Sequence, residues 1–293
     1  MLIMGVGTLN RLKVLFAVAA VAGTAWAAGP EFDRALKLYH STNFHQSIQV
    51  LQSIPSKDGA VYGLLGQNYY MDGDFKKATD SLEKALQLEP ANAQYALWLG
   101  RAFGRRAELA SPFTAPGYAN KARQYFELSV NLNPRDVDAL SDLFEYYLEA
   151  PGFLGGGADR AEATAQKASK INPIEGLAME ARLAEHRKEY SHAEQQLRHA
   201  IEIAPQQIGR FVDLARFLVR RGRVAEADQV LARAEQAAPN NPRLMFATAE
   251  IYVKSHRNLD VARDLLKRYM SASTTADDPP KADAAKLLHQ AGG

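Results

Sequence analysis

One spacing pattern that recurs along the chain constrains its fold more than any other feature. An alanine is followed four residues later by an apolar residue, seven later by a small one and twelve later by a proline. The clearest unit consists of Ala78, Leu82, Ala85 and Pro90. Further units begin at Ala122, Ala161, Ala193 and Ala227, and a last one, without the proline, at Ala262. Such a regular repeat predicts a row of equivalent structural units.

The spacing within each unit is that of helices. Steps of three and four residues place side chains on one face of an α-helix, and the proline ends that helix because it has no amide donor. A second apolar stripe precedes the alanine, for example Tyr62, Leu65 and Tyr69. Between the stripes lies a turn containing Gly73, where glycine tolerates a positive φ. Each unit is therefore predicted to be a hairpin of two antiparallel helices.

These units resemble the tetratricopeptide repeat family, whose unit of about 34 residues has large, small, aromatic, Ala and Pro positions at fixed offsets. The stretch over residues 59–92 matches at nearly every position, including Gly66, Tyr69, Phe75 and Ala78. The resemblance implies an all-α fold, a right-handed superhelical solenoid of stacked antiparallel helix hairpins. Because one hairpin cannot bury its own apolar face, stacked neighbours are expected to share a continuous core.

The repeat also predicts how the chain is divided. We expect six repeats over residues 59–270, preceded by a degenerate first repeat over residues 28–58. Residues 271–293 are predicted to form a linker and a C-terminal capping helix, because the stretch from Lys281 to Gln290 is amphipathic. Such a helix would cover the last apolar face of the stack.

Two adjacent units are longer than the pattern allows. The step from Gly100 to Ala122 is 22 residues, and the equivalent step that starts at Phe144 is 17, where the pattern needs 12. Insertions are therefore predicted in neighbouring turns, at about residues 109–119 and 150–158, side by side along one edge.

The apolar residues of these insertions are candidates for an edge-loop binding site, since insertions on one edge often mark a binding face. The candidates are Phe113, Tyr118, Phe153 and Leu154. The alternative is that the loops pack on each other and cover a local gap. Phe144 would cause such a gap, because other units have glycine or alanine at its position and a large ring there must displace something.

The resemblance places the first helix of each hairpin along a concave groove. Two positions of that helix, four residues apart, carry like charges in Arg101/Arg105, Glu145/Glu149 and Arg216/Arg220. Like charges at this spacing destabilise a helix slightly, so helix stability does not explain them. The predicted groove-binding residues are Arg101, Arg105, Arg182, Arg216, Arg220 and Tyr70.

Two interpretations of these charges remain open. The groove could select an acidic or mixed-charge peptide. Alternatively, Glu145 and Glu149 could neutralise the arginines on either side in a cross-repeat ladder. The alternation of sign favours the ladder in the middle units. It does not fully cover Arg216 and Arg220, which makes the C-terminal half the better candidate for an anionic ligand.

Residues 1–27 differ in character from the rest and have the layout of a signal peptide. Arg11 and Lys13 precede the apolar run of residues 14–22, and Ala25 and Ala27 are the small residues that a signal peptidase reads. We predict cleavage after Ala27 and a periplasmic or secreted protein. The alternative is an uncleaved segment that anchors the protein in a membrane, which would then be the protein's only membrane contact. The apolar run is, however, shorter than the roughly 18 residues needed to span a bilayer.

Composition narrows the classes of function. Without Arg11 and Lys13 the chain has 33 basic and 33 acidic side chains, so a nucleic-acid partner, which requires a basic field, is not indicated. There is no cysteine, and none of the seven histidines lies in a His-Glu-x-x-His arrangement. No nucleophile motif appears either. We therefore predict no catalytic residues, no metal and no cofactor.

The function predicted from these features is an exported scaffold that binds a protein or peptide segment in its concave groove, in assembly or maturation of a bacterial envelope. The alternative is a structural component that associates with copies of itself. An enzyme or metal-binding protein is a third class, for which the sequence offers no motif.

Overall fold

The computed structural model describes residues 29–275 and 278–292, so the predicted signal peptide lies outside the described residues. Within them the chain forms fifteen α-helices, one short 3-10 helix and no strand. The helices are α1 (Pro30–His40), α2 (Phe44–Ser53), α3 (Gly59–Met71), α4 (Phe75–Leu88), α5 (Ala93–Leu109), α6 (Ala115–Leu132), α7 (Val137–Glu149), η1 (Gly152–Leu154), α8 (Ala158–Ile171), α9 (Pro173–His186), α10 (Tyr190–Ile203), α11 (Ile208–Arg220), α12 (Val224–Ala237), α13 (Pro242–Lys254), α14 (Leu259–Ser271) and α15 (Lys281–Gln290).

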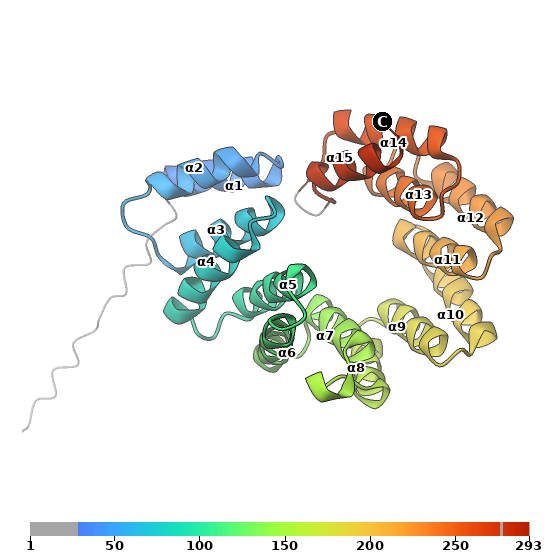
Figure 1. Ribbon diagram of the computed structural model, residues 1–293, viewed down its shortest axis with the longest axis horizontal. Helices are drawn as coiled ribbons and strands as arrows, with labels where there is room; N and C mark the ends of the chain where they lie inside the picture. Colours follow the sequence, from blue (N-terminus) through green and yellow to red (C-terminus); the bar gives the residue numbers. More distant parts are fainter. Residues whose placement is uncertain (1–28, 276–277, 293) are drawn as a thin grey trace, which may run out of the picture.

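Consecutive helices pair into hairpins, from α1–α2 to α13–α14, and the hairpins stack along a curved path (Figure 1). The odd-numbered helices from α3 to α13 follow the inner side of the curve and their even-numbered partners the outer side. The two ends of the path approach each other. The all-α solenoid predicted from the sequence is confirmed.

Capping side chains begin the inner helices. Five of these helices follow an Asn or Asp whose side-chain oxygen accepts a hydrogen bond from a backbone amide of the first turn, which satisfies a group that the helix itself leaves unpaired. These caps are Asp58, Asn92, Asp136, Asn172 and Asn241. All inner helices from α3 to α13 except α11 are thus started by a local side-chain contact.

The core is built from the repeat positions. The six repeat alanines, from Ala78 to Ala262, are at most 1% exposed. A Cβ atom added to Gly66 would lie 2.3 Å from Cγ of Leu82, and one added to Gly100 would lie 2.4 Å from Cδ1 of Phe126. The small residue of the inner helix is therefore required by the large residue of the outer helix.

The third of the six central units, α7–α8, reverses this arrangement of sizes. Phe144 of α7 is fully buried, and the α8 position equivalent to Leu82 and Phe126 holds Ala165, which is also buried. The phenylalanine ring thus occupies the room that a leucine or phenylalanine of the outer helix occupies elsewhere. The expectation that Phe144 displaces its surroundings does not hold, and the insertions lose that reason for covering a gap.

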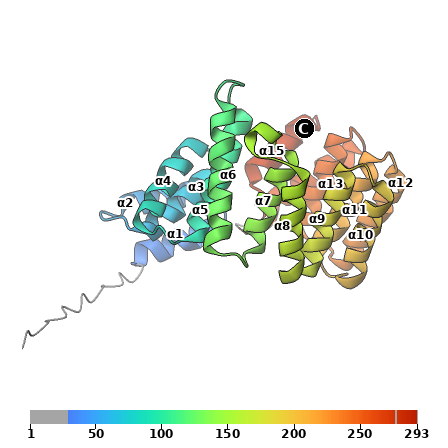
Figure 2. The ribbon, with the colours of Figure 1, turned by 90° about the horizontal axis from the view of Figure 1, so that it is seen from below.

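Most of the first insertion is helical. Helix α5 runs to Leu109 and α6 begins at Ala115, so the irregular part is residues 110–114. Pro116 lies in the first turn of α6, where its missing amide breaks no helical hydrogen bond. The longer α5–α6 hairpin projects beyond its neighbours (Figure 2). The second insertion stays irregular: η1 is followed by Gly155, whose φ of 85° suits glycine.

Helix α15 covers the last hairpin. Its Ala284 and Leu287 are buried, and the hydroxyl group of Tyr269 in α14 donates to the carbonyl of Pro279. Arg263 of α14 donates to the carbonyl of Ala291, with a distance of 2.8 Å between Nη1 and O. The predicted C-terminal capping helix is therefore present.

Candidate interaction surface

The inner face contains a cleft of about 380 Å³ between α7, α9 and α11. Its walls carry both signs of charge in equal number. The charged lining residues are Arg182, Arg210, Arg216, Arg220, Glu145, Glu175, Glu185 and Asp213. The cleft is thus strongly polar but formally neutral, unlike a site built to attract a polyanion.

Arg182 links three acidic residues across two hairpins. Its Nη2 atom lies 2.9 Å from Oε1 of Glu149 and 3.2 Å from Oε2 of Glu145, both in α7. Its Nη1 atom lies 3.7 Å from Oε2 of Glu185 in its own helix. The cross-repeat ladder predicted for the middle units is present here.

The ladder continues to the two arginines that we expected it to cover only in part. Arg216 Nη2 lies 2.6 Å from Oε2 of Glu250 in α13, and Arg220 binds both carboxylate oxygens of Glu185 at 2.6 and 2.7 Å. The expectation that the ladder does not fully cover Arg216 and Arg220 is therefore wrong. Their long side chains reach the next hairpin and the previous one, respectively, and no preference for an anion in the C-terminal half follows.

Glu250 is a branch point of this ladder. It also accepts from Nζ of Lys254 at 2.7 Å. Burial opposes ionisation of Glu250, but the hydrogen bond from Lys254 and the charge of Arg216 outweigh it, so the pKa of Glu250 lies below its ordinary value. Glu250 and Arg216 are thus held as an ion pair.

The sequence reasoning missed several acidic residues of the inner face, among them Asp142 and Asp213. Asp142 lies 2.5 Å from Nε of Arg101, which pairs with it and not with Glu145. Asp213 lies 3.5 Å from Nη1 of Arg210, which also pairs with Glu175. Burial raises the pKa of both Asp142 and Asp213, and the nearby arginines oppose the shift. Each stands three residues before a residue examined from the sequence, and that helical spacing was the available signal.

The N-terminal part of the inner face is aromatic. The Tyr70 ring lies 5.2 Å from the Trp98 ring and 5.4 Å from the Phe75 ring, both edge to face. The guanidinium of Arg101 lies over Trp98, and that of Arg105 lies over Phe75. Burial raises the pKa of Tyr70, although both arginines oppose it. Three predicted groove residues thus meet here around two rings that the sequence reasoning did not select.

The four candidates on the edge loops separate into two groups. Tyr118 packs inward: its ring stacks on Phe103, and its hydroxyl accepts from Nη2 of Arg106 at 2.7 Å. Leu154 is half-buried, and its carbonyl accepts from the hydroxyl of Tyr146 at 2.9 Å. Phe113 and Phe153, by contrast, project into solvent. The structure therefore leaves the two phenylalanines available for binding and gives Tyr118 a packing role.

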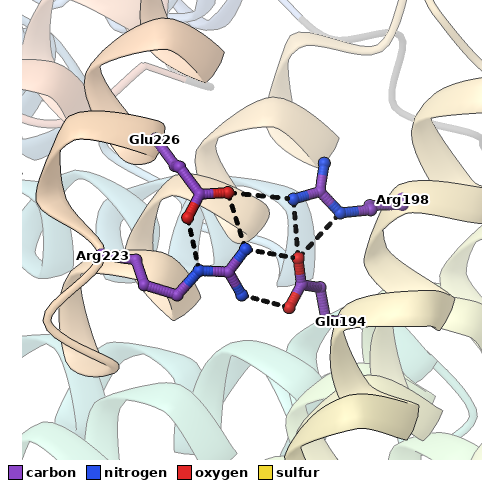
Figure 3. Close-up of polar contacts among 4 residues, drawn as sticks. All are labelled: Glu194, Arg198, Arg223 and Glu226. Atoms are coloured by element: carbon purple, nitrogen blue, oxygen red, sulfur yellow. Dashed lines mark hydrogen bonds and ion pairs between the residues drawn. The ribbon is translucent and has the colours of Figure 1, made fainter.

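Away from the cleft, α10 and the start of α12 share a closed network of four charged side chains (Figure 3). Arg223 donates to both Glu194 and Glu226, with Nε 2.6 Å from Oε1 of Glu226. Arg198 also donates to Glu194, with Nη2 2.6 Å from Oε1. The hydrogen bonds from Arg223 are the main reason that the pKa values of Glu194 and Glu226 lie below the ordinary value. Each charge in the network is paired with an opposite charge of the same network. The network joins the α9–α10 hairpin to the α11–α12 hairpin.

The described residues were compared with the requirements of a metal site and of a membrane span. No cluster of three or more histidine, cysteine or acidic residues in the described parts of the chain has a geometry that could hold a metal ion. Among the described helices, none combines the length and the apolar composition needed to cross a bilayer.

Comparison with known proteins agrees with this architecture. Models of the tetratricopeptide repeat match residues 59–92 and 184–245. The fold is a tetratricopeptide repeat solenoid. None of the curated protein sequences matches this chain.

Solved structures share the solenoid at low sequence identity. A tetratricopeptide repeat protein of Parabacteroides merdae is 17% identical, with 90% of this chain and 98% of that one covered and a TM-score of 0.56. A thermophilic tetratricopeptide repeat protein of Thermus thermophilus is 18% identical, with 69% and 98% covered and a TM-score of 0.52. One chain of the APC/C hetero-tetramer Cut9-Hcn1 is 13% identical, with 88% of this chain and 48% of that one covered and a TM-score of 0.51. At these identities the likeness concerns the fold.

Proposed function

We propose that this solenoid is a non-catalytic scaffold that binds a protein or peptide segment on its inner face. The observation that carries the proposal is the neutral, charge-lined cleft between α7, α9 and α11. Its arginines are paired, yet the side chains of Arg182, Arg216 and Arg220 remain 38%, 41% and 43% exposed. The pairs of Arg182 with Glu145 and Glu149 are exposed on both sides and contribute little stability, so a ligand can replace them with its own charges at low cost. Glu185 and Glu250 are only 12% and 19% exposed and hold Arg220 and Arg216 in place.

The charge pattern indicates the chemistry of the ligand. Because positive and negative side chains alternate over the cleft, a segment with charges of both signs complements it better than a purely acidic one. Tyr70 and Trp98, on the same inner face, offer an aromatic contact for an apolar side chain. The similarity in fold to a component of the Cut9-Hcn1 assembly supports a role in protein association.

The test is cross-linking capture from an envelope fraction, followed by mass spectrometry, with two matched variants. Arg182 and Arg187 both bind a glutamate of the preceding hairpin and are 38% and 35% exposed, but Arg187 lies outside the cleft. We expect Arg182→Glu to lower recovery of a partner about tenfold, the effect of losing about 1.4 kcal/mol. Arg187→Glu should leave recovery unchanged. Equal recovery with both variants, or capture of the chain alone, would contradict the proposal.

We further propose that the scaffold is exported and acts in assembly or maturation of a bacterial envelope. The layout of residues 1–27 supports export. N-terminal sequencing of the protein from producing cells should find a chain that begins at Ala28. A chain that retains residues 1–27 would contradict the proposed cleavage. Cell fractionation would then show whether the chain is anchored in a membrane.

A further inference from the structure

The apolar side chains that are most exposed all come from the two insertions. Among the large apolar residues of the described chain, Phe113 is 97% exposed, Phe153 is 81% exposed and Leu109 is 71% exposed, and the others are at most 55% exposed. The first two lie in the irregular segments and Leu109 is the last residue of α5. Single exposed apolar residues are ordinary on a protein surface. It is unusual, however, that the three most exposed ones all lie in the two insertions.

The two segments belong to one edge of the solenoid. Each joins the first helix of a hairpin to the second, and η1 of the second segment packs against α6 of the first. In Figure 2 the α5–α6 turn is the part that rises highest above the stacked hairpins at this edge. Phe113 therefore belongs to a projecting turn, and Phe153 belongs to the corresponding turn of the neighbouring hairpin.

Both segments are free of charge. No charged residue occurs between Glu108 and Lys121, or between Glu149 and Asp159, although charged residues make up 23% of the chain. Burying such a segment in an apolar environment requires no desolvation of an ionised group, which is the most expensive part of leaving water. Proline and glycine limit the helical content of both segments, so the rings are presented on short loops.

Shape and area decide which partner fits. The three side chains offer on the order of 500 Å², given roughly 200 Å² for each aromatic ring, whereas a stable protein interface takes about 800 Å² from each partner. A second copy of this chain, or a flat protein surface, would therefore be held too weakly by this edge alone. A lipid bilayer accepts projecting apolar side chains without a matching pocket.

We propose that this edge is a peripheral membrane-contact surface, at which Phe113, Phe153 and Leu109 insert into the interfacial region of a lipid bilayer. The contact is apolar, so its strength does not depend on anionic lipid. It is independent of the inner cleft, and variants of Arg182 leave it unchanged.

The absence of cysteine from the sequence makes a direct test possible in the full chain. A cysteine introduced by Ser111→Cys, beside Phe113, is labelled with an environment-sensitive fluorophore. Gln206→Cys, in the α10–α11 turn at the opposite edge, is the matched control. With vesicles of phosphatidylcholine, alone or mixed with phosphatidylglycerol, we expect a blue shift and brighter emission from position 111 and no change from position 206.

Phe113→Ser and Phe153→Ser, introduced together into the labelled chain, are expected to weaken the vesicle response about tenfold for each ring lost. Both rings are exposed, so helical content should stay the same. The proposal is overturned if position 111 does not respond, if both labels respond equally, or if the response requires anionic lipid and disappears in high salt. A response to a protein fraction but not to lipid vesicles would assign the edge to a protein partner instead and overturn the proposal as well.

Discussion

The packing of two residues, one from each helix of a hairpin, sets the stability of a repeat. Gly66 lies against Leu82, and Gly100 lies against Phe126, at distances that leave no room for a Cβ atom. In the α7–α8 hairpin the large residue is Phe144 and the small one is Ala165. The interior of a hairpin is thus filled by one small and one large residue, and either helix can supply the large one.

This relation predicts a compensating pair of substitutions. Phe144→Ala alone should destabilise the protein by about 3–5 kcal/mol through the cavity it leaves, and Ala165→Leu alone by about 1–3 kcal/mol through overpacking. Together they recreate the arrangement of the other repeats, so the double variant should be more stable than the sum of the single effects predicts. Urea unfolding followed by circular dichroism measures this. Strict additivity would show that the two side chains do not share a space.

At the scale of elements, charged networks join one hairpin to the next. The network of Glu194, Arg198, Arg223 and Glu226 connects α10 to the start of α12, and the inner ladder connects α7, α9, α11 and α13. Each carboxylate in the outer network is met by an arginine from the other hairpin. These contacts act on the interfaces between units, which are the weak points of a solenoid.

The outer network predicts a pH-dependent contribution to stability. The pKa values of Glu194 and Glu226 in the folded protein lie below their ordinary value of 4.5. Their stabilising effect is therefore complete above that value and is lost as the pH falls through the folded-state pKa. Arg223→Gln should lower the Tm by about 2 °C or more at pH 7, and the difference from the unmodified chain should shrink below about pH 4.5.

Arg221→Gln is the control for this experiment. Arg221 lies over the Tyr190 ring, with 4.0 Å between the guanidinium carbon and the ring centroid, and it makes no ion pair among those found in the described chain. Its effect on Tm should not vary over the same range of pH. A constant difference for Arg223→Gln as well would mean that the network contributes through packing and not through charge.

At the scale of the whole molecule, the two ends of the solenoid meet. The hydroxyl oxygens of Thr42, between α1 and α2, and Thr274, after α14, lie 3.3 Å apart. The segment around Thr274 is itself held in place, because Asp278 accepts from the amide of Thr275 at 2.7 Å and from Nε of Arg243 in α13 at 3.0 Å. The described hairpins therefore surround the inner face in nearly one complete turn (Figure 1).

Closure of the ends can be tested with a disulfide. The sequence has no cysteine, so a Thr42→Cys/Thr274→Cys variant can form only one intramolecular pair. We expect it to oxidise readily to a monomeric species, since the 3.3 Å between the two hydroxyl oxygens places the side chains in direct contact. Mass spectrometry and non-reducing electrophoresis measure the result. A variant that stays reduced under oxidising conditions, or that links only between molecules, would show that the ends are apart in solution.

The hairpins, the buried alanines and the capping helix could be predicted from the sequence because they depend on local rules. Helical periodicity, proline termination and capping act over a few residues. Because the same pattern recurs in each unit, every prediction was supported by several units. The same reasoning placed the groove arginines on the inner helices. It could not choose their partners, because Arg101 with Asp142 and Arg220 with Glu185 are contacts between hairpins.

Only the tertiary structure decided those pairings, the inward position of Tyr118 and the meeting of Thr42 with Thr274. The pairings and the meeting of the two ends depend on the rotation between successive hairpins, and small rotations add up over the whole stack. The position of Tyr118 instead depends on packing against Phe103 and Arg106 within the α5–α6 hairpin. A long arginine side chain can reach either neighbouring hairpin, so the spacing of residues leaves its partner undetermined. The sequence by itself determined the repeating unit, and the accumulated geometry of the stack determined which distant residues meet.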